Sequence, residues 1–181
     1  MAADKKTKEY CVGFDLGGTK MMAKVFDADF KTVARCKKKT KARAGAEAGV
    51  ERIVELVGES IDEAGIGPDQ LSGIGMAAPG PLDLDKGIVL DLPNLGWQKA
   101  PVKEKLEKAY GCPVAVINDV DAGVYGEYRF GAGRGGRCVL GVFPGTGIQE
   151  NLADKASNLA ALLDLASAVN AMIASRAPQG F

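Results

Sequence analysis

The sequence predicts a mixed α/β fold, and three of its features support this prediction. Three short apolar stretches follow one another near the N-terminus, which is the pattern of a three-stranded meander. Further stretches of strand length then alternate with segments of helical period, an order typical of a mixed sheet. Apolar residues make up 46% of the 181 positions, which is ample for a hydrophobic core. We therefore expect one large or two small domains with a mixed sheet of five or more strands flanked by helices.

The first half of the chain predicts a meander followed by a helix. The three strands are expected at Tyr10–Phe14, Met21–Phe26 and Lys31–Cys36. Gly17 and Gly18 form the first turn, and residues 27–29 form the second. Gly49–Ala64 has apolar side chains at the spacing of one buried helical face, so we expect a helix there.

The second half predicts strands that alternate with helices. Strands are expected at Leu71–Ala77, Pro113–Ile117 and Arg137–Phe143, and helices at Pro101–Tyr110 and Asp121–Phe130. The first of these helices has proline at its start, where the missing N–H does no harm. Residues 79–81 end the strand Leu71–Ala77, and a hairpin follows through a turn at residues 85–87.

Polar or glycine-rich segments follow four of the predicted strands. They are Asp15, Ala78-Pro79-Gly80, Asn118-Asp119 and Pro144-Gly145-Thr146-Gly147. In sheets of this kind ligands bind beyond the carboxyl ends of the strands. The sequence therefore predicts one binding site at this edge of the sheet.

The stretch from Asp15 to Lys20 has the residue types of a phosphate-binding turn. Gly17 and Gly18 let the backbone approach a ligand and direct its N–H groups outward, which suits phosphate oxygens. Thr19 adds a hydroxyl, Lys20 a cation, and Asp15 a carboxylate able to hold Mg²⁺ through water. An ordinary hairpin turn explains two glycines alone, but the additional acid, hydroxyl and lysine favour phosphate.

Two better-known phosphate motifs do not fit. Residues 13–20 approach a Walker loop, but Thr19 precedes Lys20, the reverse of the required order, and a strand follows in place of a helix. Residues 131–136 satisfy G-x-G-x-x-G, yet they follow a helical pattern and precede a strand. The dinucleotide motif needs strand, turn and helix, so we interpret this segment as a helix end and a connector.

The composition argues against several classes of function. With 23 basic and 23 acidic residues the formal net charge is zero, so we expect neither nucleic acid nor a membrane as partner. The basic stretch Lys37–Arg43 lacks aromatic residues for base stacking and reads as a strand end and solvated turn. No apolar run reaches membrane-spanning length, and we expect residues 1–9 to be a frayed tail of a cytoplasmic protein.

The sequence contains no histidine and has four cysteines that are far apart, Cys11, Cys36, Cys112 and Cys138. This excludes a Cys/His zinc site and every catalytic scheme that uses histidine. A general base must then be a carboxylate, a lysine or a rarer group. Orienting a hydroxyl for phosphoryl transfer is chemistry that a carboxylate can do.

Five motifs together resemble the ROK family, which contains bacterial glucokinase-like sugar kinases and sugar-responsive repressors. In the order and spacing of that family they are residues 15–20 (DLGGTK), 75–81 (GMAAPGP), 92–97 (LPNLGW), 117–119 (IND) and 145–148 (GTGI). The resemblance covers Lys8–Ile148 and implies the actin-like ATPase, ribonuclease H-like fold. It also implies ATP with Mg²⁺ as cofactors and a hexose such as glucose as substrate. By the same resemblance ATP phosphates are held by Asp15, Gly17, Gly18, Thr19 and Lys20, and by Gly145, Thr146 and Gly147.

Asp119 resembles the catalytic base of that family. It would accept the proton of a sugar hydroxyl as the oxygen attacks the γ-phosphorus of ATP. The alternative is that Asp119 only caps the helix that follows it. Asn94 and Asn118 can donate and accept hydrogen bonds together, which suits sugar hydroxyls, and we expect them to form the sugar site with Gly80 and Asp119. The alternative for Asn94 is a turn residue after Pro93. Trp97 lies either at the pocket rim or in the core, and we expect Glu127 to be solvated or paired locally.

Residues 149–181 depart from the family pattern. The second lobe of the family, with its sugar-binding Glu and its zinc motif, has no match, and Asn151–Arg176 reads as one helix that is apolar on more than one face. We expect this helix to be buried, either on the chain's own sheet or in a homodimer. The expected domains are a tail at 1–9, a kinase lobe at 10–148 and a divergent helix at 149–181.

Two functions are compatible with these observations. The first is ATP-dependent phosphorylation of a hexose, impaired if a second lobe must close over the sugar. The second is a non-catalytic remnant that binds sugar or nucleotide. The repressor branch needs a DNA-binding domain, for which the nine residues before the first expected strand are too few.

Overall fold

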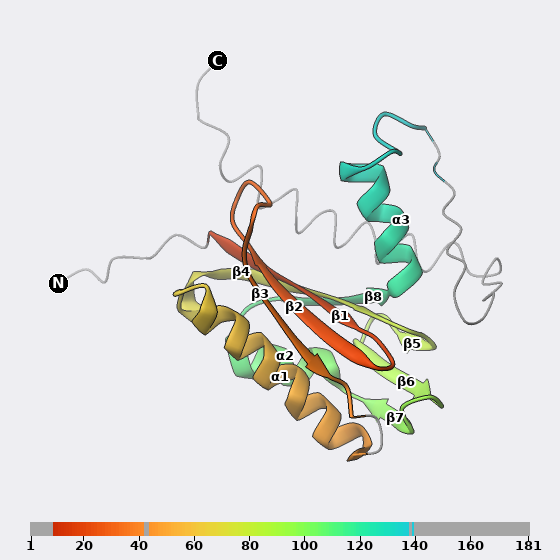
Figure 1. Ribbon diagram of the computed structural model, residues 1–181. Helices are drawn as coiled ribbons and strands as arrows, with labels where there is room; N and C mark the ends of the chain where they lie inside the picture. Colours follow the sequence, from red (N-terminus) through yellow and green to blue (C-terminus); the bar gives the residue numbers. More distant parts are fainter. Residues whose placement is uncertain (1–8, 42–43, 138, 140–181) are drawn as a thin grey trace. The chain divides into compact units, whose positions relative to one another are not determined.

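The computed structural model describes residues 9–41, 44–137 and 139. The chain divides into two compact units, Met1–Asp119 and Val120–Phe181. The described part of the first unit contains two sheets, two α-helices and a short 3₁₀ helix at Pro68–Gln70 (Figure 1). Three predicted elements fall outside the described residues. The turn at 145–147 and the helix Asn151–Arg176 lie wholly outside them, and the strand Arg137–Phe143 lies largely outside them.

The main sheet has five strands in the order β3-β2-β1-β4-β8. These are β1 (Tyr10–Leu16), β2 (Lys20–Phe26), β3 (Thr32–Lys39), β4 (Leu71–Ala78) and β8 (Val114–Asn118). β1 pairs antiparallel with β2 and parallel with β4, and β4 pairs parallel with β8. The predicted mixed sheet is thus confirmed. β3 extends three residues beyond its predicted end, because its backbone still pairs with β2 where the side chains are already charged.

A second sheet has three antiparallel strands in the order β5-β6-β7. They are β5 (Leu82–Asp83), β6 (Ile88–Leu92) and β7 (Trp97–Ala100). The β5–β6 hairpin is the predicted one, and Gly87 in its turn has a φ of 60°, which glycine tolerates. The sequence pattern does not predict β7, because four residues are too few to establish a period of two.

Two helices cover the same face of the main sheet. α1 (Gly45–Glu63) packs on β2 and β3, α2 (Val102–Tyr110) packs on β8, and the two helices contact each other (Figure 1). α1 begins four residues before its predicted start, because its first turn carries only small and polar residues and so lacks the apolar period. α2 ends at Tyr110 and is capped by Gly111, whose φ of 62° gives the left-handed conformation that glycine favours at a helix end.

The face of the sheet under these helices is the hydrophobic core. Alternate strand residues point into it and are at most 2% exposed, among them Val12, Phe14, Leu16, Met21, Ala23 and Val25. α1 contributes Ile53, Leu56 and Val57, which are fully buried. The residues between those of β1 and β2, such as Gly13, Asp15, Met22 and Lys24, are half-buried or exposed. The opposite face of the sheet is therefore more open.

Trp97 of β7 joins the second sheet to α1. Its side chain is fully buried, and a Cβ added at Gly49 of α1 would overlap the indole ring. The indole Nε1 is buried without a hydrogen-bond partner among the described residues. Of the two positions expected for Trp97, the core is correct and the pocket rim is wrong.

β3 is an edge strand whose helix-facing side is paired with α1. Lys38 forms ion pairs with Glu59 at 2.6 Å and with Glu55 at 3.6 Å. These pairs are exposed, so each contributes only roughly 0.2–1 kcal/mol.

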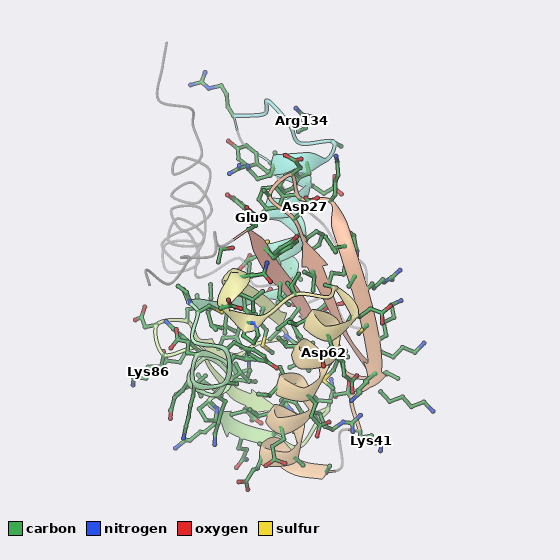
Figure 2. All side chains as sticks on the ribbon, turned by 90° about the vertical axis from the view of Figure 1, so that its left-hand side faces the viewer. Glu9, Asp27, Lys41, Asp62, Lys86 and Arg134 are labelled. Atoms are coloured by element: carbon green, nitrogen blue, oxygen red, sulfur yellow. The ribbon has the colours of Figure 1, made fainter. Side chains whose placement is uncertain are left out.

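The other side of β3 presents cations to solvent. Arg35, Lys37 and Lys39 are exposed, and Figure 2 shows nitrogen-tipped side chains along this strand. The β2–β3 register places Lys39 opposite Lys20 and Arg35 opposite Lys24. The predicted basic strand end and turn is therefore mostly strand up to Lys39, with like charges facing each other across the pair.

The described part of the second unit is α3 (Asp119–Phe130, whose first residue belongs to the first unit) and the glycine-rich segment after it. Glu127 Oε2 accepts a hydrogen bond from the Ala132 N–H at 3.0 Å, so Glu127 is paired locally, as predicted. Residues 131–135 form bends and turns, in agreement with a helix end and connector.

We expect Gly49→Ala to destabilise the protein, although alanine is the better helix former. The added methyl group overlaps the Trp97 ring, and overpacking of this kind costs roughly 1–3 kcal/mol of unfolding free energy. Gly126→Ala in α3 is the matched control, because a Cβ there meets nothing within 4 Å. Urea unfolding followed by circular dichroism measures both variants. A Gly49→Ala protein as stable as the wild type would contradict the described packing.

Candidate functional site

The turn between β1 and β2 contains two glycines with different roles. The Gly17 N–H donates to Lys20 O at 3.0 Å and closes the turn. A Cβ at Gly17 would lie only 2.7 Å from Lys20 O, so the turn requires glycine there. A Cβ at Gly18 would meet nothing within 4 Å. Gly17 thus makes the turn possible, whereas Gly18 leaves open space in front of it.

The same turn presents backbone donors to that space. In the described part of the chain, the N–H groups of Gly18 and Thr19 donate to no other residue. Gly18, Thr19 and Lys20 are all exposed. Successive free N–H groups beside a cation form the concave surface that binds anions in many proteins. The geometry is therefore compatible with the phosphate-binding role that the sequence predicts.

Thr40 hydrogen-bonds to two backbone carbonyls of this turn. The sequence does not predict Thr40 as a site residue. Its side chain is fully buried, and its Oγ1 donates to Gly17 O at 2.7 Å. Its backbone N–H donates to Thr19 O at 2.9 Å. The only sequence signal is a single hydroxyl residue that interrupts a lysine run at the end of β3. Such a residue is recognised only once the pairing of β2 with β3 is known.

Two carboxylates face the same edge of the sheet. Asp15 is near the end of β1 and Asp119 directly follows β8, and β4 lies between these two strands. Burial raises the pKa of the Asp15 carboxyl above its ordinary value of 3.8, and the nearby Asp119 carboxylate raises it further. The structure therefore brings these two predicted site residues into electrostatic contact. The like charge of Asp119 therefore disfavours ionisation of the Asp15 carboxyl.

Two of the predicted sugar-binding residues meet beside Asp119. Asn118 is half-buried at the end of β8, and a Cβ at Gly80 would lie 3.6 Å from Asn118 Nδ2. Asn94 is exposed in the turn between β6 and β7, which is closed by a Leu95 N–H to Leu92 O bond at 2.9 Å. The role of all three residues in sugar binding stays a prediction.

The second predicted phosphate turn, Gly145-Thr146-Gly147, lies outside the described residues. Among the residues that the structure describes, no group of three His, Cys, Asp or Glu side chains is arranged to hold a metal ion. No helix in the described ranges is long and apolar enough to cross a membrane.

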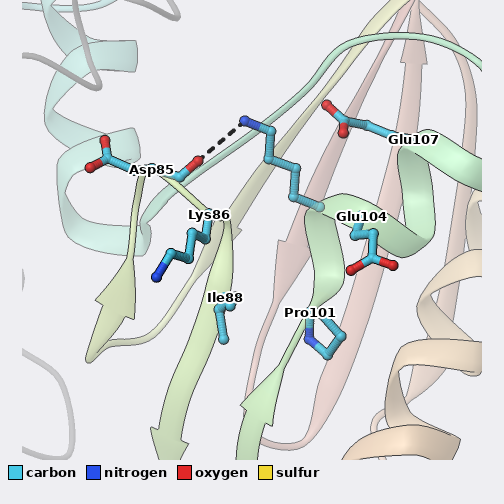
Figure 3. A pocket seen from close by; sticks show the side chains of 7 residues that line it. Asp85, Lys86, Ile88, Pro101, Glu104 and Glu107 are labelled. Atoms are coloured by element: carbon cyan, nitrogen blue, oxygen red, sulfur yellow. Dashed lines mark hydrogen bonds between the residues drawn. The ribbon is translucent and has the colours of Figure 1, made fainter.

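A shallow hollow lies on another part of the first unit, between β6 and α2. Its volume is about 350 Å³, and it is lined by Asp85, Lys86, Ile88, Pro101, Lys103, Glu104 and Glu107 (Figure 3). The Lys103 Nζ donates to Asp85 O at 3.4 Å across it. None of the predicted site residues lines this hollow. The candidate site is therefore the strand-end edge and not this hollow.

Residues 11–150 match the model of the ROK family. The chain is 34% identical over 137 residues to a glucokinase of Streptomyces coelicolor, which covers 76% of this chain and 41% of the relative. A xylose repressor of Bacillus subtilis is 38% identical over 81 residues, which covers 45% of this chain and 21% of the repressor. The chain spans about two fifths of the length of the curated glucokinases that it matches.

A ROK family glucokinase from Streptomyces griseus, solved in complex with glucose and AMPPNP, is similar in structure. The TM-score is 0.60 and the identity 36%, over 70% of this chain and 38% of that chain. Its fold is the actin-like ATPase fold, so the predicted fold class is confirmed for the described lobe.

Asp15→Asn is expected to abolish a loss of unfolding free energy that the wild type shows as the pH rises. Because the folded-state pKa of Asp15 is raised, the stability linked to this group is fully present below its ordinary pKa of 3.8. That stability is lost as the pH rises through the raised value. Between about pH 3.5 and pH 7 the wild type should therefore lose stability relative to the Asn variant, as thermal unfolding of both proteins would show. A relative gain by the wild type would rule out the raised pKa.

Proposed function

The chain belongs to the ROK family, and from this premise we propose that it carries the nucleotide-binding lobe of a sugar kinase. The γ-phosphoryl group of ATP would pass to a hydroxyl of a hexose such as glucose. The glucokinase relatives support this substrate class and this donor. The observation that carries the proposal is the turn at Gly17–Thr19, whose outward N–H groups lie at the same sheet edge as Asp15 and Asp119.

In this proposal the phosphates of ATP bind in front of Gly18. The N–H groups of Gly18 and Thr19 donate to phosphate oxygens, and Lys20 adds a positive charge. Gly145, Thr146 and Gly147 are proposed as a second phosphate turn on their motif alone.

Asp15 fits a role in holding a divalent cation through water. Burial and the nearby Asp119 charge raise the pKa of the Asp15 carboxyl, and a cation beside it would favour its ionised form. Mg²⁺ is commonly bound by one or two carboxylates together with phosphate oxygens, so Asp15 would hold it and Asp119 would stay available as the base. When bound, Mg²⁺ neutralises charge on the β- and γ-phosphates.

Asp119 would act as the general base. As the sugar oxygen forms its bond to the γ-phosphorus, the bond to ADP breaks and the hydroxyl proton passes to the Asp119 carboxylate. Asn118, which contacts the Gly80 position, can orient a neighbouring sugar hydroxyl by donating and accepting together. Asn94 is proposed as a further sugar contact.

The domain assignment is part of the same proposal. Residues 10–148 would form the kinase lobe of a cytoplasmic enzyme, after a tail at 1–9. Residues 149–181 would form a separate apolar segment that covers the lobe or joins two copies of the chain.

A second candidate is a protein that binds sugar or nucleotide without catalysis, because a xylose repressor is 38% identical to this chain over 81 residues. A coupled ADP-release assay with a panel of hexoses, beside calorimetric titration with ATP, separates the two. Turnover with one sugar supports the kinase, and ATP or sugar binding without turnover supports the alternative.

Asp119→Asn should reduce kcat by about two orders of magnitude or more, because loss of a positioned base typically costs 10²–10⁴-fold. Asp121→Asn is the control, since it removes a charge from the same first turn of α3. Steady-state kinetics and thermal unfolding of both variants are required. Unchanged turnover would exclude Asp119 as base, and loss of folding would favour the capping role.

Gly18→Val should weaken ATP binding by about tenfold or more, because the side chain would occupy the space proposed for phosphate. The fold should be retained, since nothing lies within 4 Å of the added Cβ. Gly17→Ala is the contrasting variant, which should also destabilise the turn itself. Calorimetry with ATP and with glucose measures the effect. Equal loss of both ligands in Gly18→Val would mean that the turn is only structural.

A further inference from the structure

We propose that Thr40 is a positioning residue that aims the backbone N–H of Gly18 in the glycine turn at phosphate. The inference rests on the proposed function of that turn. Thr40 lies one residue beyond the end of β3, and the turn lies just before the start of β2. Because β2 and β3 pair antiparallel, these two points are neighbours in the sheet although 21 positions separate Thr19 from Thr40.

Thr40 holds both ends of the turn at once. Its hydroxyl binds the carbonyl of Gly17 at 2.7 Å, and its N–H binds the carbonyl of Thr19 at 2.9 Å. These two carbonyls flank Gly18, beside which the structure leaves open space. The Gly17–Gly18 and Thr19–Lys20 peptide units, whose carbonyls are held, therefore have little freedom to rotate.

The direction of these bonds determines which way the donors point. A peptide unit is planar and trans, so its C=O and N–H point in opposite directions. The Gly17 carbonyl and the Gly18 N–H belong to one peptide unit, and that carbonyl points to Thr40. The Gly18 N–H therefore points away from Thr40. The same bond keeps a partially negative carbonyl oxygen away from the proposed phosphate position.

Thr40 is itself fixed by the segment that leads into α1. The Arg52 Nη2 of α1 donates to Lys39 O at 2.8 Å, and the Ala44 N–H donates to Lys41 O at 3.1 Å. Lys41 has a φ of 52°, a left-handed conformation that non-glycine residues rarely adopt. The peptides on both sides of Thr40 are thus held by, or lead directly into, the helix that forms the core.

The hydroxyl is the testable part of this arrangement. Valine has nearly the shape of threonine but no donor, so Thr40→Val leaves the Gly17 carbonyl without its partner while the packing is kept. Serine restores the donor. Ser60 supplies the matched control, because it is the other fully buried hydroxyl among the described polar side chains and donates to Val57 O at 2.7 Å within α1.

The experiment compares the 181-residue wild-type chain with Thr40→Val, Thr40→Ser and Ser60→Ala, using ATP and glucose as calorimetric probes. Thr40→Val should raise the Kd for ATP roughly tenfold, with glucose affinity unchanged, and Thr40→Ser should recover most of the ATP affinity. Ser60→Ala should lower the unfolding midpoint without weakening ATP binding. Where turnover is measurable, Thr40→Val should raise the KM for ATP more than it lowers kcat.

Three results overturn the inference. If Thr40→Val lowers the unfolding midpoint but binds ATP as the wild type does, Thr40 has only a structural role and the proposed function stands. If Thr40→Val and Ser60→Ala weaken ATP binding equally, the effect comes from general destabilisation. A wild type that binds neither ATP nor glucose would instead contradict the proposed function, and with it this role of Thr40.

Discussion

β1 pairs antiparallel with β2 on one side and parallel with β4 on the other, and the position of the candidate site follows from this change of direction. The parallel strands β1, β4 and β8 all end at one edge of the sheet. The chain must leave β1 at that edge and return at once along β2, which requires a very tight turn. The glycine turn, the Gly80 segment and Asp119 are therefore brought together by topology and not by a shared stretch of sequence.

The core and the site are mechanically linked through α1. This helix packs on β2 and β3 and also contacts β7, where Gly49 makes room for the buried ring of Trp97. The same helix carries Arg52, which holds the carbonyl of Lys39 at the end of β3. An element that is buried for stability thus fixes the backbone behind the glycine turn. A rigid support of this kind lets a short exposed turn keep a defined shape.

The sequence was informative where local periodicity reflects burial. The strands of the main sheet alternate or run apolar because one face lies under helices, and five of them could be located to within a few residues. The glycine turn and Asp119 could be singled out because acid, glycine and hydroxyl residues follow strand ends. The sequence did not predict β7 or the first turn of α1, because neither carries enough large apolar residues to show a period.

Residues that act through long-range contacts could not be found in this way. Thr40 owes its importance to the antiparallel pairing of β2 with β3, and nothing in its neighbours distinguishes it from a solvated loop residue. The sequence could not decide whether Trp97 lies at the pocket rim or in the core, because the space for its ring is provided by Gly49, 48 positions earlier in the chain. Tertiary context decided both cases.

The cation-bearing edge of the main sheet has a consequence for how the protein behaves in concentrated solution. An unpaired edge strand is a template for strands of other molecules. If two copies met through β3, the side chains of Arg35, Lys37 and Lys39 would face their own kind across the new pair, so electrostatic repulsion opposes that contact. This protection depends on weak screening, since the Debye length falls from about 10 Å at 0.1 M salt to about 3 Å at 1 M. Among the described strands β3 has a neighbour on one side only, so we expect this edge to resist self-association less as the ionic strength rises.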